Sequence, residues 1–331
     1  MDERRAQQAW ERIQAAKHVL IVNDVRIDGD TMGSSLAVAQ VLRRLHKRVT
    51  HISPMPISEA FNFLPGIREI TFDTVALHDS TIDLILSFDC ADGDHVVEFR
   101  SHVPHHPFLI SFDHHVTNPR YGDLNLLIPE ASSTGEVVWQ FLKKNRVALS
   151  HESATCLLTA ICTDTTFFSN DATNVVCLEA AAELGRLGAR VHDVVRAMYA
   201  NKPVSLLRVW GTCMERLQKL PDGTVVTYLK REDVPKDEDL DLDTSSLANF
   251  LTSLVHGAPM ICVLVEKQDG SVKASLRGTT RNVAEIASRH GGGGHIKAAG
   301  FSVAGASVAQ EGEDMFLVDA AGNHVPLISY F

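Results

Sequence analysis

The sequence lacks a long hydrophobic run, a paired-cysteine motif and an excess of basic residues. No uninterrupted apolar stretch approaches the ~18 residues that a membrane-spanning helix needs, so we expect no membrane segment. The 6 cysteines include no CxxC pair and most lie in apolar runs, which favours reduced core residues over a disulfide framework or a zinc site. The first residues form a charged amphipathic pattern without the apolar stretch of a signal peptide, and we therefore expect a cytoplasmic protein.

The charge balance is acidic, with a formal net charge of −10 at pH 7. Non-specific binding of duplex nucleic acid needs a broad basic face, so the composition argues against duplex DNA as a partner. A small phosphate-bearing substrate stays open, because a local cluster of metal ions and arginine can override the overall charge at short range. With 331 residues the chain exceeds one typical core, and two domains are expected.

Four short apolar runs in the first third of the chain have the length of buried strands. They are HVLIVND at residues 18–24, VTHISP at 49–54, DLILSFD at 83–89 and FLISFD at 108–113. Between the first two runs, residues 31–48 have apolar side chains at helical spacing. This order predicts an α/β fold, a parallel sheet with helices on both faces. Ligands bind at the carboxyl ends of such strands, where three of the four runs place an acid.

The pattern changes near residue 200, where we place the domain boundary. Residues 1–200 form the first predicted domain, 201–220 a helical linker, and 221–331 a smaller α/β domain. In the smaller domain, Gln268–Asp269–Gly270 is predicted to be the turn of a β-hairpin. The acidic run at 236–243 is expected to be a solvated loop.

Three aspartates lie at even spacing in VNDVRIDGDTMGSS, namely Asp24, Asp28 and Asp30. If this segment is extended, their carboxylates project to the same side, where they repel one another unless cations sit among them. A helix is then expected to begin at Gly33 and Ser34, with free amides that favour an anion. The alternative is a surface turn with helix-capping acids, which a single DxD would favour.

The cation hypothesis gains support from acids and imidazoles further along the chain. Asp89 ends the third apolar run, Asp113, His114 and His115 end the fourth, and Asp164 follows a helical pattern. Carboxylate with imidazole suits Mn²⁺ and similar ions. Carboxylates that bridge two such ions allow them to stabilise both the attacking and the leaving oxygen in phosphoryl displacement. A further segment, STGEVV at 133–138, has the pattern of a helix start with free amides.

Near the carboxyl end, GGGGHIKAAG at residues 291–300 is either a flexible loop or an anion site. Glycines let backbone amides approach an anion closely, and arginine is suited to bidentate phosphate contact. The candidate substrate-binding residues are Arg277, Gly293, Gly294, His295 and Lys297. Arg281 and Lys297 also fit the pattern of plain surface charges.

The order of these motifs resembles the DHH phosphoesterase superfamily over about residues 15–303. More narrowly, it is similar to the branch of bacterial oligoribonucleases (nanoRNases) and 3′-phosphoadenosine 5′-phosphate phosphatases. The resemblance implies that residues 1–200 form a parallel-sheet DHH domain and residues 221–331 an α/β DHH-associated domain. It also implies that the second domain closes over the first and holds the non-scissile end of a short substrate.

Carried over by position, the resemblance implies two bound Mn²⁺ ions, with Mg²⁺ as an alternative. Asp28 would ligate the first metal and Asp30 the second, while Asp89 would bridge both. His114 and Asp164 would complete the second site.

Two further roles and one departure follow from the same resemblance. His115 would either donate a hydrogen bond to the substrate phosphate or lie behind the metal ligands without touching a metal, and Asp113 would orient the histidine pair. Most relatives have histidine where this chain has Asp24. We expect Asp24 to ligate the first metal and to shift the preference toward harder ions; the alternative is that Asp24 has disabled the chemistry.

The resulting prediction is a metal-dependent phosphodiesterase that hydrolyses short oligoribonucleotides to 5′-mononucleotides, with 3′-phosphoadenosine 5′-phosphate as a further substrate. The alternatives are a cyclic dinucleotide phosphodiesterase, acting on c-di-AMP or pApA, an enzyme acting chiefly on 3′-phosphoadenosine 5′-phosphate, and a non-catalytic nucleotide sensor. By analogy with the family, we expect a homodimer.

Overall fold

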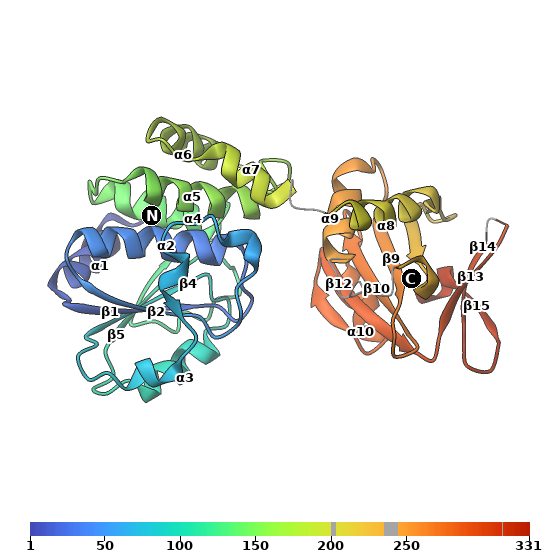
Figure 1. Ribbon diagram of the computed structural model, residues 1–331, viewed down its shortest axis with the longest axis horizontal. Helices are drawn as coiled ribbons and strands as arrows, with labels where there is room; N and C mark the ends of the chain where they lie inside the picture. The colour runs from blue at the N-terminus through green and yellow to red at the C-terminus, as the bar shows by residue number, and fades with distance from the viewer. Residues whose placement is uncertain (200–202, 235–243, 313) are drawn as a thin grey trace. The chain divides into compact units, whose positions relative to one another are not determined.

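The computed structural model describes residues 1–199, 203–234, 244–312 and 314–331. The chain divides into two compact units, Met1–Asn201 and Lys202–Phe331 (Figure 1). The predicted acidic loop at 236–243 lies outside the described residues. All 6 cysteines are buried and unbridged, as the sequence predicts.

The first unit is built on a parallel six-stranded sheet with the order β3-β2-β1-β4-β5-β6. Its strands are β1 (His18–Asn23), β2 (Arg48–Ile52), β3 (Ile70–Thr71), β4 (Leu84–Phe88), β5 (Phe108–Asp113) and β6 (Leu124–Leu127). The four predicted strands are confirmed as β1, β2, β4 and β5. The sequence analysis missed the two edge strands, which have 2 and 4 residues and are too short to stand out as apolar runs.

Helices cover both faces of this sheet (Figure 1). They are α1 (Glu3–Ala15), α2 (Gly29–Arg44), α3 (Asp94–His102), α4 (Thr134–Lys144) and α5 (His151–Asp164). Two more helices, α6 (Val175–Arg186) and α7 (Val191–Tyr199), pack against α5. Side chains of β1 alternate between the faces: Val19 and Ile21 pack in the core with α1, α2, α4 and α5, whereas Leu20 and Val22 pack with α3. The α/β prediction is therefore confirmed for this unit.

Helix α2 begins four residues before the predicted start at Gly33. Asp28 is its N-cap, because its carboxylate accepts hydrogen bonds from the backbone amides of Asp30 and Thr31. The expectation of an extended segment through Asp30 is therefore wrong, since Asp30 lies in the first helical turn. Gly33 instead lies inside the helix, where α2 packs against α5.

The second unit has a mixed six-stranded sheet with the order β11-β12-β10-β9-β8-β7, and a three-stranded sheet, β13-β14-β15. The larger sheet contains β7 (Gln218–Lys219), β8 (Val225–Leu229), β9 (Met260–Glu266), β10 (Ser271–Gly278), β11 (Gly293–His295) and β12 (Ala298–Ala304). The smaller contains β13 (Ser307–Glu311), β14 (Asp314–Val318) and β15 (His324–Pro326). The helices are α8 (Val204–Glu215), α9 (Thr244–Leu254) and α10 (Val283–Arg289). The predicted hairpin turn joins β9 to β10.

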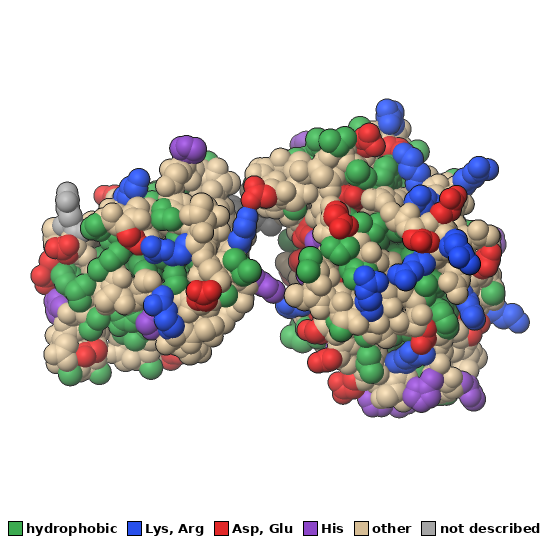
Figure 2. All heavy atoms as spheres, turned by 180° about the vertical axis from the view of Figure 1, so that it is seen from behind, with side chains coloured by type: hydrophobic (Ala, Val, Ile, Leu, Met, Phe, Trp, Pro, Cys, Tyr) green, Lys and Arg blue, Asp and Glu red, His purple; other side chains and the backbone are tan. Residues whose placement is uncertain are grey.

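Helix α8 packs into the second unit, because Leu206 and Val209 share a buried cluster with Leu229 and Val263. On the face shown in Figure 2, acidic and basic side chains of the described residues are intermixed on both units. None of the helices in the described part of the chain combines the length and the apolar character needed to cross a bilayer.

The close approach of α2 to α5 predicts a specific cost for Gly33→Ala. An added Cβ would collide with the carbonyl oxygen of Cys156 and lie 2.8 Å from the nitrogen of Ala160. Overpacking of this kind should lower the free energy of unfolding by about 1–3 kcal/mol, measured by urea denaturation followed by circular dichroism. Gly185→Ala in α6 is the matched control, since no atom lies within 4 Å of its added Cβ. Equal stability of the two variants would contradict the packing argument.

Candidate metal centre

Acidic side chains gather at the carboxyl edge of the parallel sheet. Asp89 directly follows β4 and Asp113 ends β5. Asp28 and Asp30 lie at the start of α2, which follows β1, and Asp164 is the last residue of α5. The sequence prediction that these acids share one end of the sheet agrees with their positions in the fold.

Asp30 is fully buried at the amino end of α4. Its two carboxylate oxygens accept hydrogen bonds from the backbone amides of Thr134 and Gly135, at 2.6 Å and 2.8 Å. Burial, followed by the charges of Asp89 and Asp164, raises the pKa of Asp30 well above its ordinary value. The amides therefore fix this carboxylate without removing its repulsion with its neighbours.

Asp89 is held by two threonine hydroxyls. The hydroxyl of Thr31 donates to Oδ2 at 2.8 Å, and that of Thr134 donates to Oδ1 at 2.9 Å. Burial and the nearby charges of Asp28 and Asp164 raise the pKa of Asp89 to about 8. The backbone of Asp89 has a φ of 62°, in the left-handed region that aspartate tolerates better than most residues.

His114 directs one ring nitrogen into this group of acids. Its Nε2 lies 3.1 Å from Asp164 Oδ2, 3.8 Å from Asp89 Oδ1 and 3.9 Å from Asp30 Oδ2. Its Nδ1 lies 3.2 Å from the carbonyl oxygen of Ala131 and donates to it, which leaves Nε2 facing the acids. Burial acts to lower the pKa of His114, but the hydrogen bond and charge of Asp164 prevail and raise it to about 9.

Asp113 organises the two histidines, although it is not directed at the other acids. Its Oδ1 accepts hydrogen bonds from the backbone amides of His114 and His115 and from Nδ1 of His115, the last at 2.8 Å. Its Oδ2 accepts from Asn118 Nδ2. Burial opposes the charged form of Asp113, but its bonds with His115 outweigh burial and lower the pKa of Asp113. The hydrogen bond with Asp113, followed by the charge of Asp89, raises the pKa of His115 against the effect of burial.

The donor set fits divalent cations. Ligand atoms of Asp30, His114 and Asp164 lie within 4.8 Å of one another, as do those of Asp89, His114 and His115. Oxygen and imidazole ligands suit Mn²⁺ and similar ions. Without a cation Asp89 would keep a proton up to about pH 8, and a cation would replace that proton; the pKa of Asp30 is raised in the same direction. Asp28 belongs to the same electrostatic group, because burial and then the charge of Asp164 raise its pKa.

Asp24 belongs to a different group of side chains from the one to which the sequence analysis assigned it. Its carboxylate is almost fully buried and accepts hydrogen bonds from the backbone amide of Val25 and, at 3.2 Å, from the guanidinium of Arg26. Its ligand atoms lie within 4.8 Å of those of Cys90 and His95. Its predicted role as a ligand of the first metal stays a prediction.

The sequence analysis missed the threonines that hold Asp89. The segment STGEVV gave one usable signal, because the free amides at the start of α4 are those that bind Asp30. The hydroxyl contacts of Thr31 and Thr134 join helices far apart in the sequence. No local pattern marks such contacts.

The predicted substrate-binding residues lie on the second unit. Gly293, Gly294 and His295 form β11, an exposed strand paired with β12. Gly294 has a φ of 141°, which only glycine adopts readily. Arg277 Nε donates to Asn249 Oδ1 at 2.6 Å, and burial lowers the pKa of Arg277. The roles of these residues, and of the exposed Lys297, stay predictions.

Comparison with known proteins places these features in a family. The family model described as "DHH family, N-terminal domain" matches residues 18–161, and that described as "DHHA1 domain" matches residues 224–317. The chain is 30% identical over 310 residues to the bifunctional oligoribonuclease and PAP phosphatase NrnA of Thermus thermophilus, with 91% of each chain covered. It is 22% identical over 288 residues to the protein of the same description from Bacillus subtilis, with 86% of this chain and 89% of that protein covered.

A solved structure shares the fold. The exopolyphosphatase-related protein from Bacteroides fragilis has a TM-score of 0.78 and 24% sequence identity, with 91% of each chain covered.

Because the pKa of Asp89 is raised, we predict that metal removal destabilises the protein more at about pH 8 than at about pH 5. The folded, metal-free site keeps the proton of Asp89 up to about pH 8, whereas an unfolded aspartate releases its proton near ~4. The folded state thus binds more protons across this window, so its stability falls as pH rises. His114 acts in the same direction, since its stabilising contribution is lost as pH rises toward its pKa of about 9.

Thermal unfolding with EDTA and with Mn²⁺ at both pH values tests this expectation. The increase in Tm on adding Mn²⁺ should be larger at the higher pH, and Asp89→Asn should reduce that difference. Asp73→Asn, at an exposed position of the same unit, should behave like the unaltered chain. An Mn²⁺ effect that is equal at both pH values would contradict the electrostatic argument.

Thr134→Val should weaken Mn²⁺ binding by about tenfold, because partners that orient a metal ligand typically contribute this much. The change removes the hydroxyl bond to Asp89 but keeps the backbone amide that binds Asp30. Isothermal titration calorimetry measures the affinity. Thr159→Val is the matched control, since Thr159 is a buried helical threonine whose hydroxyl donates to the Thr155 carbonyl. Equal affinity in the two variants would show that the Thr134 hydroxyl does not support the site.

Proposed function

The chain belongs to the DHH family of phosphoesterases, and we propose that it is a metal-dependent phosphodiesterase that hydrolyses short oligoribonucleotides to 5′-mononucleotides and also dephosphorylates 3′-phosphoadenosine 5′-phosphate. The main support is the convergence of Asp30, Asp89, His114 and Asp164 in one group with the geometry of a cation site. The descriptions of the Thermus and Bacillus relatives support the choice of substrate.

In this proposal the metals are two Mn²⁺ ions, with Mg²⁺ as the alternative. When bound, such a pair supplies an activated water and neutralises charge on the phosphate. The chain holds the ligands ready for them. The amides of Thr134 and Gly135 fix Asp30, and His114 presents Nε2 because its Nδ1 donates to a backbone carbonyl.

His115 is the proposed donor to the substrate phosphate. Asp113 accepts from its Nδ1, so Nε2 is the nitrogen left to donate to a phosphate oxygen. The raised pKa of His115 favours the protonated ring, which can bind a developing negative charge. Asp113 therefore acts through His115 as a positioning residue.

The proposal extends to further positions of the site and of the second unit. Asp28 and Asp24 are proposed ligands of the first metal, and Arg277, Gly293, Gly294, His295 and Lys297 are proposed to bind substrate. A homodimer and a cytoplasmic location are also part of the proposal. If Asp24 prevents catalysis, the chain is instead a nucleotide sensor that binds the same ligands without turnover.

A hydrolysis panel with Mn²⁺ tests the function. The substrates are di- to pentaribonucleotides, 3′-phosphoadenosine 5′-phosphate, c-di-AMP, pApA and pyrophosphate, and release of 5′-mononucleotides from the short ribonucleotides is the expected result. Turnover of c-di-AMP alone would favour a cyclic dinucleotide phosphodiesterase, and absence of any turnover would favour the sensor.

His115→Asn should lower kcat on the preferred substrate by about 10²-fold or more, because it removes a charged donor at the phosphate. Mn²⁺ binding, measured by calorimetry, should change far less than kcat. His106→Asn is the control, since His106 is exposed on a loop of the same unit. If His115→Asn retains full kcat, His115 does not contact the reacting phosphate.

A further inference from the structure

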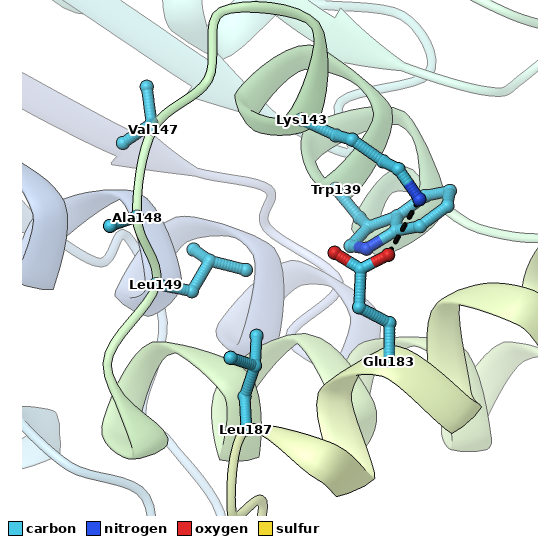
Figure 3. A pocket seen from close by; sticks show the side chains of 7 residues that line it. All are labelled: Trp139, Lys143, Val147, Ala148, Leu149, Glu183 and Leu187. Carbon is cyan, nitrogen blue, oxygen red and sulfur yellow. Dashed lines mark hydrogen bonds and ion pairs between the residues drawn. The ribbon is translucent and has the colours of Figure 1, made fainter.

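A small cavity in the first unit has its charged groups paired with each other. It has a volume of about 150 Å³ and lies between α4 and α6, with Trp139, Lys143 and Glu183 among its lining residues (Figure 3). Lys143 Nζ is 2.6 Å from Glu183 Oε2, and Trp139 is 4% exposed. These groups are therefore not presented to a ligand. The second unit, by contrast, contains an exposed strand whose support can be traced to single residues.

Strand β11 needs support from outside to keep one conformation. It consists of Gly293, Gly294 and His295, which are all exposed, and it lies at the edge of the larger sheet with β12 as its neighbour. Glycine loses more conformational freedom on folding than any other residue, so two glycines in three positions make this strand costly to order. The same three residues are proposed to bind substrate. Whatever holds β11 therefore bears on binding.

Backbone hydrogen bonds fix the chain where it leaves β11. The carbonyl oxygen of Ile296 accepts from the amide of Val283 at 2.9 Å, and that of Lys297 accepts from the amide of Gly278 at 2.9 Å. These two bonds attach the chain after β11 to the start of α10 and to the end of β10. Because they join backbone groups only, they do not depend on which side chains are present.

Three rings gather where the chain enters β11. His290 is the C-cap of α10, and its ring centre lies 4.7 Å from that of Phe301 in β12 and 5.1 Å from that of Tyr330. The rings of Phe301 and Tyr330 are nearly parallel, with an angle of 8° between their planes and 6.2 Å between their centres. Ring pairs at such separations stabilise a structure beyond the effect of the area that they bury.

The ring cluster of His290, Phe301 and Tyr330 lies directly against the entry of the strand. An added Cβ on Gly292 would collide with the carbonyl oxygen of Gly300 and with the side chain of Phe301. Phe301 is 4% exposed, whereas His290 and Tyr330 are half-buried. The chain between α10 and β11 is therefore held between a buried ring in β12 and the ring of Tyr330.

Tyr330 is the member of this cluster that comes from a distant segment. It belongs to the short helix Leu327–Tyr330, in which Leu327 is fully buried in the core of the second unit. The carbonyl oxygen of Tyr330 accepts a hydrogen bond from Nε2 of His290 at 3.0 Å. Tyr330 lies outside the part of the chain that matches the DHHA1 domain. This segment therefore adds a contact to β11 that the matched domain itself does not contain.

We propose that Tyr330 is a positioning residue which, acting through His290, holds β11 in the conformation that binds substrate. The inference rests on the proposed function, because substrate binding by Gly293, Gly294 and His295 is part of that function. Without the ring of Tyr330, β11 samples further conformations. The apparent affinity for substrate then falls in proportion to the fraction of chains that stay competent to bind. The metal ligands belong to the first unit and keep their contacts.

Steady-state kinetics test this role. Tyr330→Ala removes the ring but keeps the carbonyl oxygen that binds His290. On the short ribonucleotide that the unaltered chain hydrolyses best, it should raise KM about tenfold, the effect expected for the loss of two ring contacts, and leave kcat unchanged. Tyr330→Phe keeps the ring and should restore KM. Ile328→Ala is the matched control, since Ile328 lies in the same short helix and is 40% exposed.

Amide hydrogen exchange, followed by NMR without substrate, tests the contact independently of activity. The amides of Gly293 and Gly294 should exchange about tenfold faster in Tyr330→Ala than in Tyr330→Phe, whereas those of β9 should keep their protection. Unchanged exchange in β11 would overturn the inference and leave the proposed function standing. Absence of turnover in the unaltered chain would count against the proposed function instead, and the exchange rates alone would then decide the role of Tyr330.

Two kinetic results would also contradict the inference. Faster exchange with an unchanged KM would show that substrate binding does not need an ordered β11. A lower kcat with an unchanged KM would place the effect of Tyr330 outside substrate binding. If circular dichroism shows that Tyr330→Ala is unfolded, Tyr330→Leu takes its place in both measurements, because leucine fills much of the same space without an aromatic face.

Discussion

Repulsion among carboxylates at the carboxyl edge of one sheet is the constraint on which the site depends. Asp30 and Asp89 are buried; the charge of Asp89 raises the cost of ionising Asp30, and the charges of Asp28 and Asp164 raise the cost of ionising Asp89. The protein meets part of this cost with fixed donors, namely two amides at the start of α4 and two threonine hydroxyls. His114 adds a positive charge in the absence of metal. These groups hold the acids in place, but only cations can balance them once all are ionised.

The helical layer is packed so that this group can form. Gly29 lies at the start of α2, and an added Cβ would collide with Thr163, the residue before Asp164. Gly135 lies in the first turn of α4, where a Cβ would collide with that of Ala160 in α5. The missing side chains let the amino ends of α2 and α4 approach the carboxyl end of α5. Acids from distant parts of the sequence meet there, and the same contacts that pack the helices place the ligands.

The sequence predicted those parts of the site that depend on strand ends. Asp89, Asp113 and His114 follow apolar runs, and parallel strands bring their carboxyl ends to one edge. The conformation of Asp30 was beyond this reasoning, because a DxD motif is compatible with an extended segment and with a helix cap. The roles of Thr31 and Thr134 depend on tertiary contacts.

The two ends of the aspartate motif differ in how firmly they are held. Two buried amides bind Asp30, and its carboxylate cannot turn without leaving them unpaired. Asp24 is buried as well, with 4% of its side chain exposed, but its charged partner is Arg26, whose side chain is 52% exposed. Arg26 can therefore change position together with Asp24, whereas the backbone amides that bind Asp30 cannot. The ligand atoms of Asp30, His114 and Asp164 already lie within 4.8 Å of one another, whereas Asp24 belongs to a different group, with Cys90 and His95. Fixed backbone amides therefore hold one end of the motif, and a side chain that can change rotamer pairs with the other end.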